Sequence, residues 1–164
     1  MDSLKLDQFL KLIGSGKKEI FVTTFTEPVL KKTGNPYEGV KKITRSRVNV
    51  NFNYANDVNL GRLAEGKNLD FQKKERAWGT RVDDTCVIEH KGAKYIECEL
   101  VKKEASYYID KDRNMLTVDQ LTPFLPAQKP SAHQGLENPI IINTYKLANI
   151  KEVEIDTVKY LLTE

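Results

Sequence analysis

The sequence has very few cysteines, histidines and tryptophans, and it has no long apolar run. It contains two cysteines, two histidines and one tryptophan in 164 residues. Two cysteines cannot build the disulfide framework of a small secreted domain. No apolar run approaches the roughly 20 residues that a transmembrane helix needs. The first residues also lack the basic region and apolar core of a signal peptide, so we expect a cytoplasmic protein.

The short motifs of common catalytic sites are also missing. The sequence has no GxSxG, HExxH or P-loop pattern, and both histidines, His90 and His133, lie in turn or loop segments. Neither Cys86 nor Cys98 has a visible activating partner. Without a nucleophile, a base or a cofactor motif, the sequence favours a binding protein without cofactors over an enzyme.

Two patterns of potential metal ligands are incomplete. Residues 110–114 place two aspartates and an asparagine at the spacing that begins a calcium loop. The sixth position is Met115 where glycine is needed, and the twelfth is Leu121 where glutamate is needed, which favours a β-turn. The two cysteines and His90 would need a fourth ligand to bind zinc, and no CxxC pair is present. We therefore expect no metal, and two reduced cysteines that pack as small apolar side chains.

The clearest structural pattern is the alternation of apolar and polar residues over residues 44–54. The apolar side chains on one side of this predicted strand are Val48, Val50, Phe52 and Tyr54. The other side carries Arg45, Arg47, Asn49, Asn51 and Asn53. Side chains alternate between the two faces of a strand, so the first set is expected to be buried and the second exposed. The exposed row would hold two positive charges and no carboxylate.

Positive charge is concentrated in the same part of the chain. Residues 30–81 contain twelve Lys and Arg against five Asp and Glu, a local net charge of +7. The remaining residues contain fourteen against eighteen, or −4, and the two values sum to the +3 of the whole chain. Such asymmetry favours one basic surface for an anionic partner, unless folding scatters these charges over a solvated surface.

Cations and aromatic residues in this region predict a site for single-stranded nucleic acid. Such sites combine a basic groove that follows the phosphates with rings that stack on the bases. Trp78 is the central candidate ring, although core packing is the commoner fate of a lone tryptophan. The predicted site combines two parts of the basic region and contains Arg45, Arg47, Asn49, Asn51, Lys73, Lys74, Arg76, Trp78 and Arg81.

The strand and turn patterns predict a mainly β (α+β) protein with two or three short helices. Apolar spacing predicts the helices in segments 4–13, 56–66 and 117–125. Further strands are predicted in segments 19–26, 86–89, 94–101, 104–109, 140–147, 153–155 and 158–162. We expect a single domain over residues 1–164, built as a small barrel-like (OB-like) or strongly bent antiparallel sheet.

Two loops of this fold carry more specific predictions. The turn at residues 90–93 joins two strands, and an odd-length loop would put the apolar set on one face, namely Cys86, Ile88, Ile96, Cys98 and Leu100. Residues 126–138 have loop composition over a dozen residues. Loops of that length are often functional or disordered, so we expect this one to be mobile.

Four segments resemble small uncharacterised proteins of tailed phages. They are KTGNPY at 32–37, NYAN at 53–56, RAWG at 76–79 and YKLANI at 145–150. The resemblance covers most of the chain and implies a phage origin, and hence the cytoplasm of the host cell. It implies nothing about catalysis and assigns no residue roles.

Together these patterns predict a non-catalytic protein that binds nucleic acid, with single strands favoured over duplexes and no membrane contact. DNA and RNA are equally compatible with the sequence. The alternative is a phage virion or host-interaction protein without a nucleic-acid role, whose charges only keep it in solution. Homo-oligomers are compatible with the sequence, and symmetric self-association in an assembly would favour that alternative.

Replacing Trp78 with alanine tests the ring at the centre of the predicted site. If the ring stacks on a base, Trp78→Ala weakens binding of a single-stranded oligonucleotide by roughly 1–3 kcal/mol. The slope of log affinity against log salt changes little, because no charge is removed. Fluorescence anisotropy at two salt concentrations measures both quantities. An unfolded variant, seen by circular dichroism, would instead show that the tryptophan belongs to the core.

Overall fold

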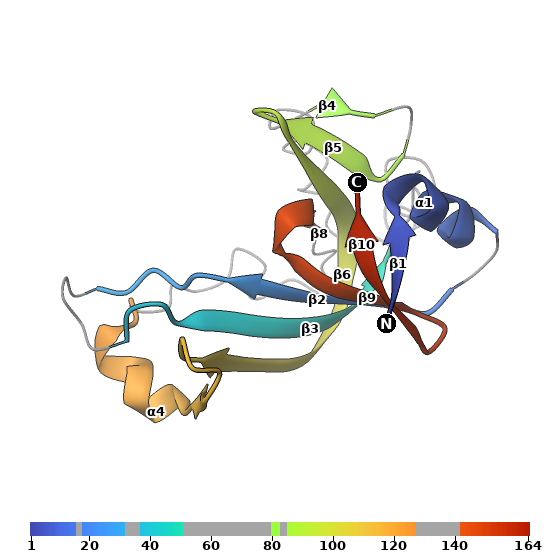
Figure 1. Cartoon of the computed structure of the whole chain (residues 1–164). Helices are drawn as coiled ribbons and strands as arrows, with labels where there is room; N and C mark the ends of the chain where they lie inside the picture. The colour runs from blue at the N-terminus through green and yellow to red at the C-terminus, as the bar shows by residue number, and fades with distance from the viewer. Residues whose placement is uncertain (16–17, 32–36, 51–79, 83–84, 127–141) are drawn as a thin grey trace, which may run out of the picture.

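The structure is a computed structural model that describes residues 1–15, 18–31, 37–50, 80–82, 85–126 and 142–164 (Figure 1). Its first elements are β1 (Asp2–Lys5), α1 (Leu6–Gly14), β2 (Ile20–Thr26), β3 (Lys41–Asn49), β4 (Thr80–Arg81) and β5 (Val87–His90). The later elements are β6 (Ala93–Ile109), β7 (Met115–Leu116), α4 (Val118–Leu121), the 3₁₀ turn η2 (Thr122–Phe124), β8 (Ile142–Lys146), the 3₁₀ turn η3 (Leu147–Asn149), β9 (Ile150–Ile155) and β10 (Val158–Thr163).

The described strands form one mixed sheet. Its order is β1-β10-β9-β2-β3-β6-β5-β4, and β7 and β8 also pair with β6. The prediction of a mainly β protein is confirmed. The prediction of a purely antiparallel sheet is wrong, because β1 pairs in parallel with β10. The prediction of a barrel-like form is also wrong, because the described strands do not close into a barrel. β1 and β10 lie far apart in the sequence, and such long-range pairing leaves no local pattern.

The predicted helix 4–13 begins two residues later than expected. Residues 2–5 pair with β10 instead, so that Leu4 lies opposite Leu162 and both are buried. The helix α1 then starts at Leu6 and buries Phe9 and Ile13 in the same core. The apolar spacing therefore found the buried side of the helix but not the strand that precedes it.

The main core lies on one face of the sheet, which we name the inner face. Ile20 and Val22 of β2 lie opposite Ile155 and Val153 of β9, and all four are buried. Phe9 of α1 is fully buried in the same cluster. Truncating a buried phenylalanine to alanine costs about 3–5 kcal/mol. Docking of α1 on the inner face is therefore a main source of stability.

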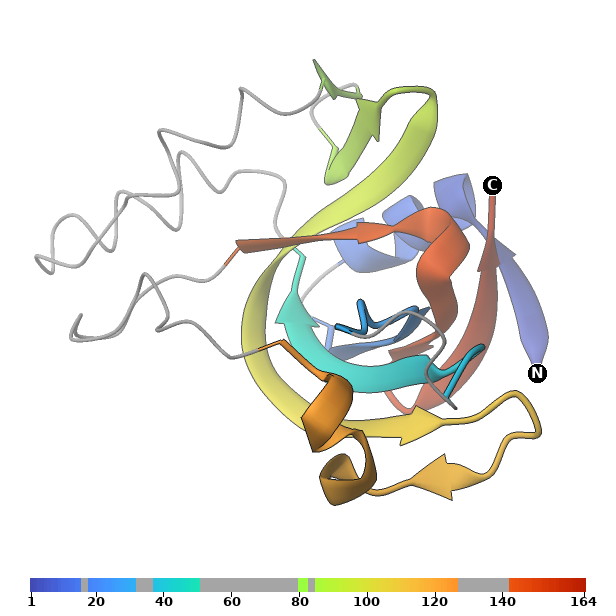
Figure 2. The ribbon, with the colours of Figure 1, turned by 90° about the vertical axis from the view of Figure 1, so that its left-hand side faces the viewer.

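The strand β6 spans 17 residues, where the sequence predicts two strands over 94–101 and 104–109. Its pairing with β3 skips Val101 and Glu104, so the register shifts at both positions. Such bulges bend a strand and increase its twist. Figure 2 shows β6 curving around β3. The curvature allows this one strand to pair with β3, β5, β7 and β8 along its length.

The β5–β6 hairpin has a different register from the predicted one. Lys91 and Gly92 form a two-residue turn with φ of 48° and 78°, the positive values that a type I′ turn requires. Val87, rather than Ile88, therefore shares a face with Ile96, and the odd-length loop is wrong. Val87 and Ile88 are both buried, so the apolar pattern could not choose between the two registers.

Most of the remaining local predictions agree with the described structure. The strands β2 and β8 fall in predicted segments, β10 extends one residue beyond 158–162, and β9 begins three residues before 153–155. Thr117 caps α4, with its hydroxyl accepting a hydrogen bond from the Gln120 N–H at 3.2 Å. The predicted strand 44–54 starts earlier, at Lys41, and is the strand β3. Its residues 51–54 lie outside the described residues. The predicted helix 56–66 and the loop residues 127–138 lie outside them as well. No described helix has the length and apolar character to cross a membrane.

The buried thiol of Cys98 predicts an alkaline limit to stability. Burial raises the pKa of Cys98 well above its usual range, and Cys86, Glu97 and Glu99 act in the same direction. Because the folded-state pKa is the higher one, stability is complete below about pH 8.5, where an exposed thiol titrates, and falls as the pH rises beyond it. Urea denaturation over this range should show the fall. Cys98→Ala should flatten it, and an unchanged slope in that variant would contradict the assignment.

Candidate nucleic-acid interface

The face of β2, β3 and β6 opposite to the inner face carries the predicted cations, and we name it the outer sheet face. Strand pairing aligns its side chains in three rows, which are Phe21–Arg47–Lys102, Thr23–Arg45–Ala105 and Phe25–Ile43–Tyr107. The neighbouring strand β9 adds Glu154 beside Phe21 and Glu152 beside Thr23. Cations, carboxylates and rings therefore share one side of the sheet.

Arg45 is only partly exposed and is held by two partners. Its Nη2 donates a hydrogen bond to Glu154 Oε2 at 2.9 Å, and its Cζ lies 3.9 Å from the centroid of the Phe21 ring. The side chains of Arg45 and Glu154 are 36% and 14% exposed. The prediction of an exposed row without a carboxylate is therefore wrong at Arg45. The carboxylate comes from β9, which the alternation within residues 44–54 could not reveal.

Arg47 is more accessible than Arg45 and has a weaker partner. Its side chain is 49% exposed, and its Nη2 lies 3.6 Å from Glu19 Oε2. Directly opposite on β6 lies Lys102, which is exposed and forms no ion pair within the described part of the chain. Asn49 is exposed, as predicted, and lies opposite Glu99. The exposed row of the prediction is thus confirmed at Arg47 and Asn49.

Most of the other predicted site residues are not placed by the structure. Asn51, Lys73, Lys74, Arg76 and Trp78 lie outside the described residues. The backbone of Arg81 belongs to β4, which pairs with β5 at the end of the sheet path, so β5 and β6 separate it from β3. The structure therefore joins Arg45, Arg47 and Asn49 on one strand and does not bring Arg81 to that strand.

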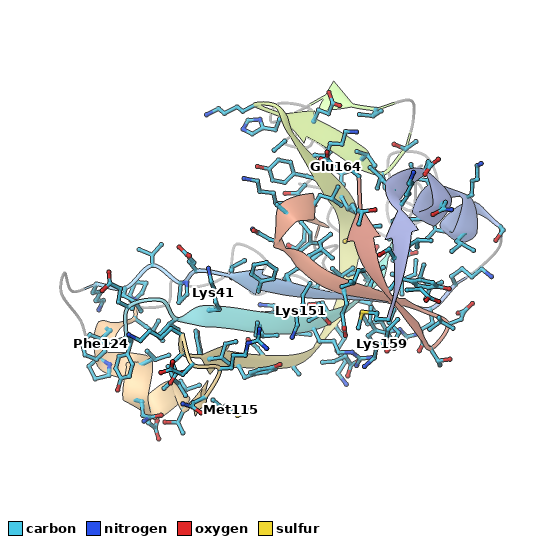
Figure 3. The ribbon with its side chains drawn as sticks, in the orientation of Figure 1. Lys41, Met115, Phe124, Lys151, Lys159 and Glu164 are labelled. Carbon is cyan, nitrogen blue, oxygen red and sulfur yellow. The ribbon has the colours of Figure 1, made fainter. Side chains whose placement is uncertain are left out.

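A groove at the far end of the outer sheet face was not predicted from the sequence. It has a volume of about 460 Å³ and is lined by Phe25, Lys41, Ile43, Tyr107, Ile109, Arg113, Met115 and Lys151. Figure 3 labels Lys41 on β3, Met115 on β7 and Lys151 on β9. These residues come from five separate segments of the chain, so no local motif could have indicated the groove.

The charged residues that line this groove are all cations. Lys41 is paired with the exposed carboxylate of Glu27, and this contact lowers the pKa of Glu27. Arg113 and Lys151 form no ion pair with any described residue. The groove therefore combines two rings, two apolar floor residues and a local excess of positive charge.

Neither a potential metal site among the described residues nor a similar known protein indicates a further function. Among the residues that the structure describes, no three His, Cys, Asp or Glu side chains gather as potential metal ligands. Comparison of the chain with protein-family models, curated proteins and solved structures found no match. The resemblance to proteins of tailed phages therefore stays a prediction.

The partners of Arg45 and Arg47 predict different roles for the two arginines in stability. Arg45→Ala removes a partly buried ion pair and a ring contact, and we expect it to lower the free energy of unfolding by about 1 kcal/mol. Arg47→Ala should change it by less than about 0.5 kcal/mol, because its pair is exposed. Urea denaturation measures both, and Glu154→Gln completes a double-mutant cycle. Equal losses for the two variants would contradict the assignment.

Proposed function

We propose that the protein is a non-catalytic nucleic-acid-binding protein that takes a single strand along its outer sheet face. The observation that carries this proposal is the position of Arg47 directly opposite Lys102. Like charges opposite each other in an antiparallel pair destabilise a sheet by roughly 0.2–1 kcal/mol. A phosphate between the two side chains would remove that repulsion. We name Arg47 and Lys102 the cationic pair.

The shape of the surface favours single strands over duplexes. Of the described helices, α1 has nine residues and buries its apolar side in the core, and α4 has four residues. Neither offers the exposed recognition helix that typically enters a major groove. Unpaired bases instead stack on rings presented by a sheet, beside cations that contact the phosphates.

Carboxylates on one side of the outer sheet face limit where a strand can lie. Glu152 and Glu154 on β9 flank β2, and Glu19 lies beside Arg47. Like charge repels phosphates from the β9 side. The cationic pair belongs to β3 and β6, so a bound strand is expected to follow these two strands there rather than cross to Glu152 and Glu154 of β9.

The salt dependence of binding tests the cationic pair. For single strands, the slope of log affinity against log salt is about −0.7 per neutralised phosphate. Arg47→Ala combined with Lys102→Ala should therefore flatten the slope by roughly one to one and a half units. Fluorescence anisotropy with a labelled oligonucleotide measures this slope. The matched control is Lys5→Ala with Lys11→Ala, because both lysines are exposed and belong to β1 and α1 rather than to β3 or β6.

Two results would count against this function. An equal change of slope in the control variant would remove the cationic pair from the interface. Absence of wild-type binding at low salt to single- and double-stranded DNA and RNA would exclude nucleic acid as the partner. The virion or host-interaction role would then be the better hypothesis, and self-association in sedimentation experiments would support it.

A further inference from the structure

The groove on the outer sheet face has an apolar floor between two rings. Ile43 lies between Phe25 and Tyr107 in one cross-strand row, and Ile109 follows Tyr107 along the same face of β6. Ile43 is buried, whereas both rings are partly exposed. Met115, which also lines the groove, is 70% exposed. A planar apolar ligand in the groove would therefore shield partly exposed apolar surface from water.

Arg113 is brought to the groove by a tightly bonded turn. The Asp110 carboxylate accepts hydrogen bonds from the N–H groups of Asp112 and Asn114, each at 2.9 Å. The Arg113 N–H donates to the Asp110 carbonyl at 3.0 Å. Arg113 itself has a φ of 65°, which glycine or asparagine adopts more readily than arginine. Strained backbone of this kind tends to occur at binding sites.

Two cations of the groove come from different elements and are available to a ligand. Lys151 belongs to β9 and Arg113 to the β6–β7 turn. Neither forms an ion pair with the described residues, whereas the third cation, Lys41, is bound to Glu27. A guanidinium can bind a phosphate through two parallel hydrogen bonds, and a lysine adds a point charge.

We propose that this groove binds one nucleotide unit. The base lies over Ile43 and Ile109 between the two rings, and the phosphate lies at Arg113 and Lys151. A groove of about 460 Å³ is within the usual size for a small-molecule site. The floor offers apolar contacts, so we expect little discrimination between bases. This inference rests on the proposed function in one respect only, which is the source of the nucleotide unit. The unit belongs to the bound strand if the protein binds one, and is a free nucleotide otherwise.

The groove offers both rings and cations, and a nucleotide can contact both kinds of side chain, whereas a simpler ligand cannot. A purely apolar ligand would leave Arg113 and Lys151 without a partner, and an inorganic anion would leave the rings exposed. Ile43 and Arg47 are four positions apart along β3, a distance of about 13 Å. The groove and the cationic pair are therefore two distinct contacts that one oligonucleotide can reach and one mononucleotide cannot.

Calorimetric titration of the full chain with adenosine 5′-monophosphate, adenosine and inorganic phosphate tests the groove. The nucleotide should bind at least about tenfold more tightly than either of its parts, because only it reaches the rings and the cations together. Tyr107→Leu should weaken nucleotide binding about tenfold. Lys151→Ala should also weaken it, and the matched control Lys159→Ala, on β10, should leave it unchanged (Figure 3).

Arg113→Gly separates a binding role from a structural one. Glycine accepts a φ of 65° without strain, so this variant should unfold at a temperature no lower than that of the wild type. Its affinity for the nucleotide should nevertheless fall about tenfold, because the guanidinium is lost. A loss of thermal stability without a loss of affinity would overturn the proposal.

Binding of a single-stranded oligonucleotide of about twelve nucleotides distinguishes the two proposals. If the oligonucleotide binds, but the mononucleotide does not and Arg113→Gly leaves oligonucleotide affinity unchanged, the groove proposal is wrong and the proposed function stands. If the mononucleotide binds through Arg113 but the oligonucleotide does not bind, the groove takes free nucleotides and the proposed function is wrong. Equal affinities for nucleotide, adenosine and phosphate would also overturn the groove proposal.

Discussion

The backbone ladder between β3 and β6 is the constraint on which both candidate contacts depend. It runs from the pairing of Lys41 with Ile109 to that of Asn49 with Glu99. Its register places Arg47 against Lys102 at one end and Ile43 against Tyr107 at the other. A slip of one residue would move these side chains to the inner face. The core on the inner face, with Val48 buried, opposes such a slip.

Charge divides the outer sheet face into two parts. On the β9 side, Glu154 accepts the guanidinium of Arg45, so this cation already has a partner in the folded protein. On the β6 side, Lys102 lies opposite a second cation. Arg45 therefore supports the fold, whereas Arg47 has only the exposed carboxylate of Glu19 at 3.6 Å and Lys102 has no ion pair among the described residues. Phosphates are therefore attracted to the cationic pair and repelled from Glu152 and Glu154 on β9.

The groove shows a conflict between local preference and position that is typical of functional sites. Arginine is an unfavourable choice for the left-handed backbone at position 113, yet the turn around Asp110 holds it there. Met115 also lines the groove, and its large exposed apolar side chain is unfavourable in water. Both residues lie next to the rings of Phe25 and Tyr107 in the groove. The proposed nucleotide would contact the Arg113 guanidinium, Met115 and the two rings together.

The sequence by itself determined most local elements, because caps, turns and period-two patterns act over a few residues. Thr117 and the turn at Asp156 identified α4 and the terminal hairpin in this way. Tertiary structure alone decided the parallel pairing of β1 and the meeting of Arg45 with Glu154, 109 residues away. It also assembled the groove from five segments. Contacts between distant strands depend on global pairing, which leaves no trace in a short stretch of sequence.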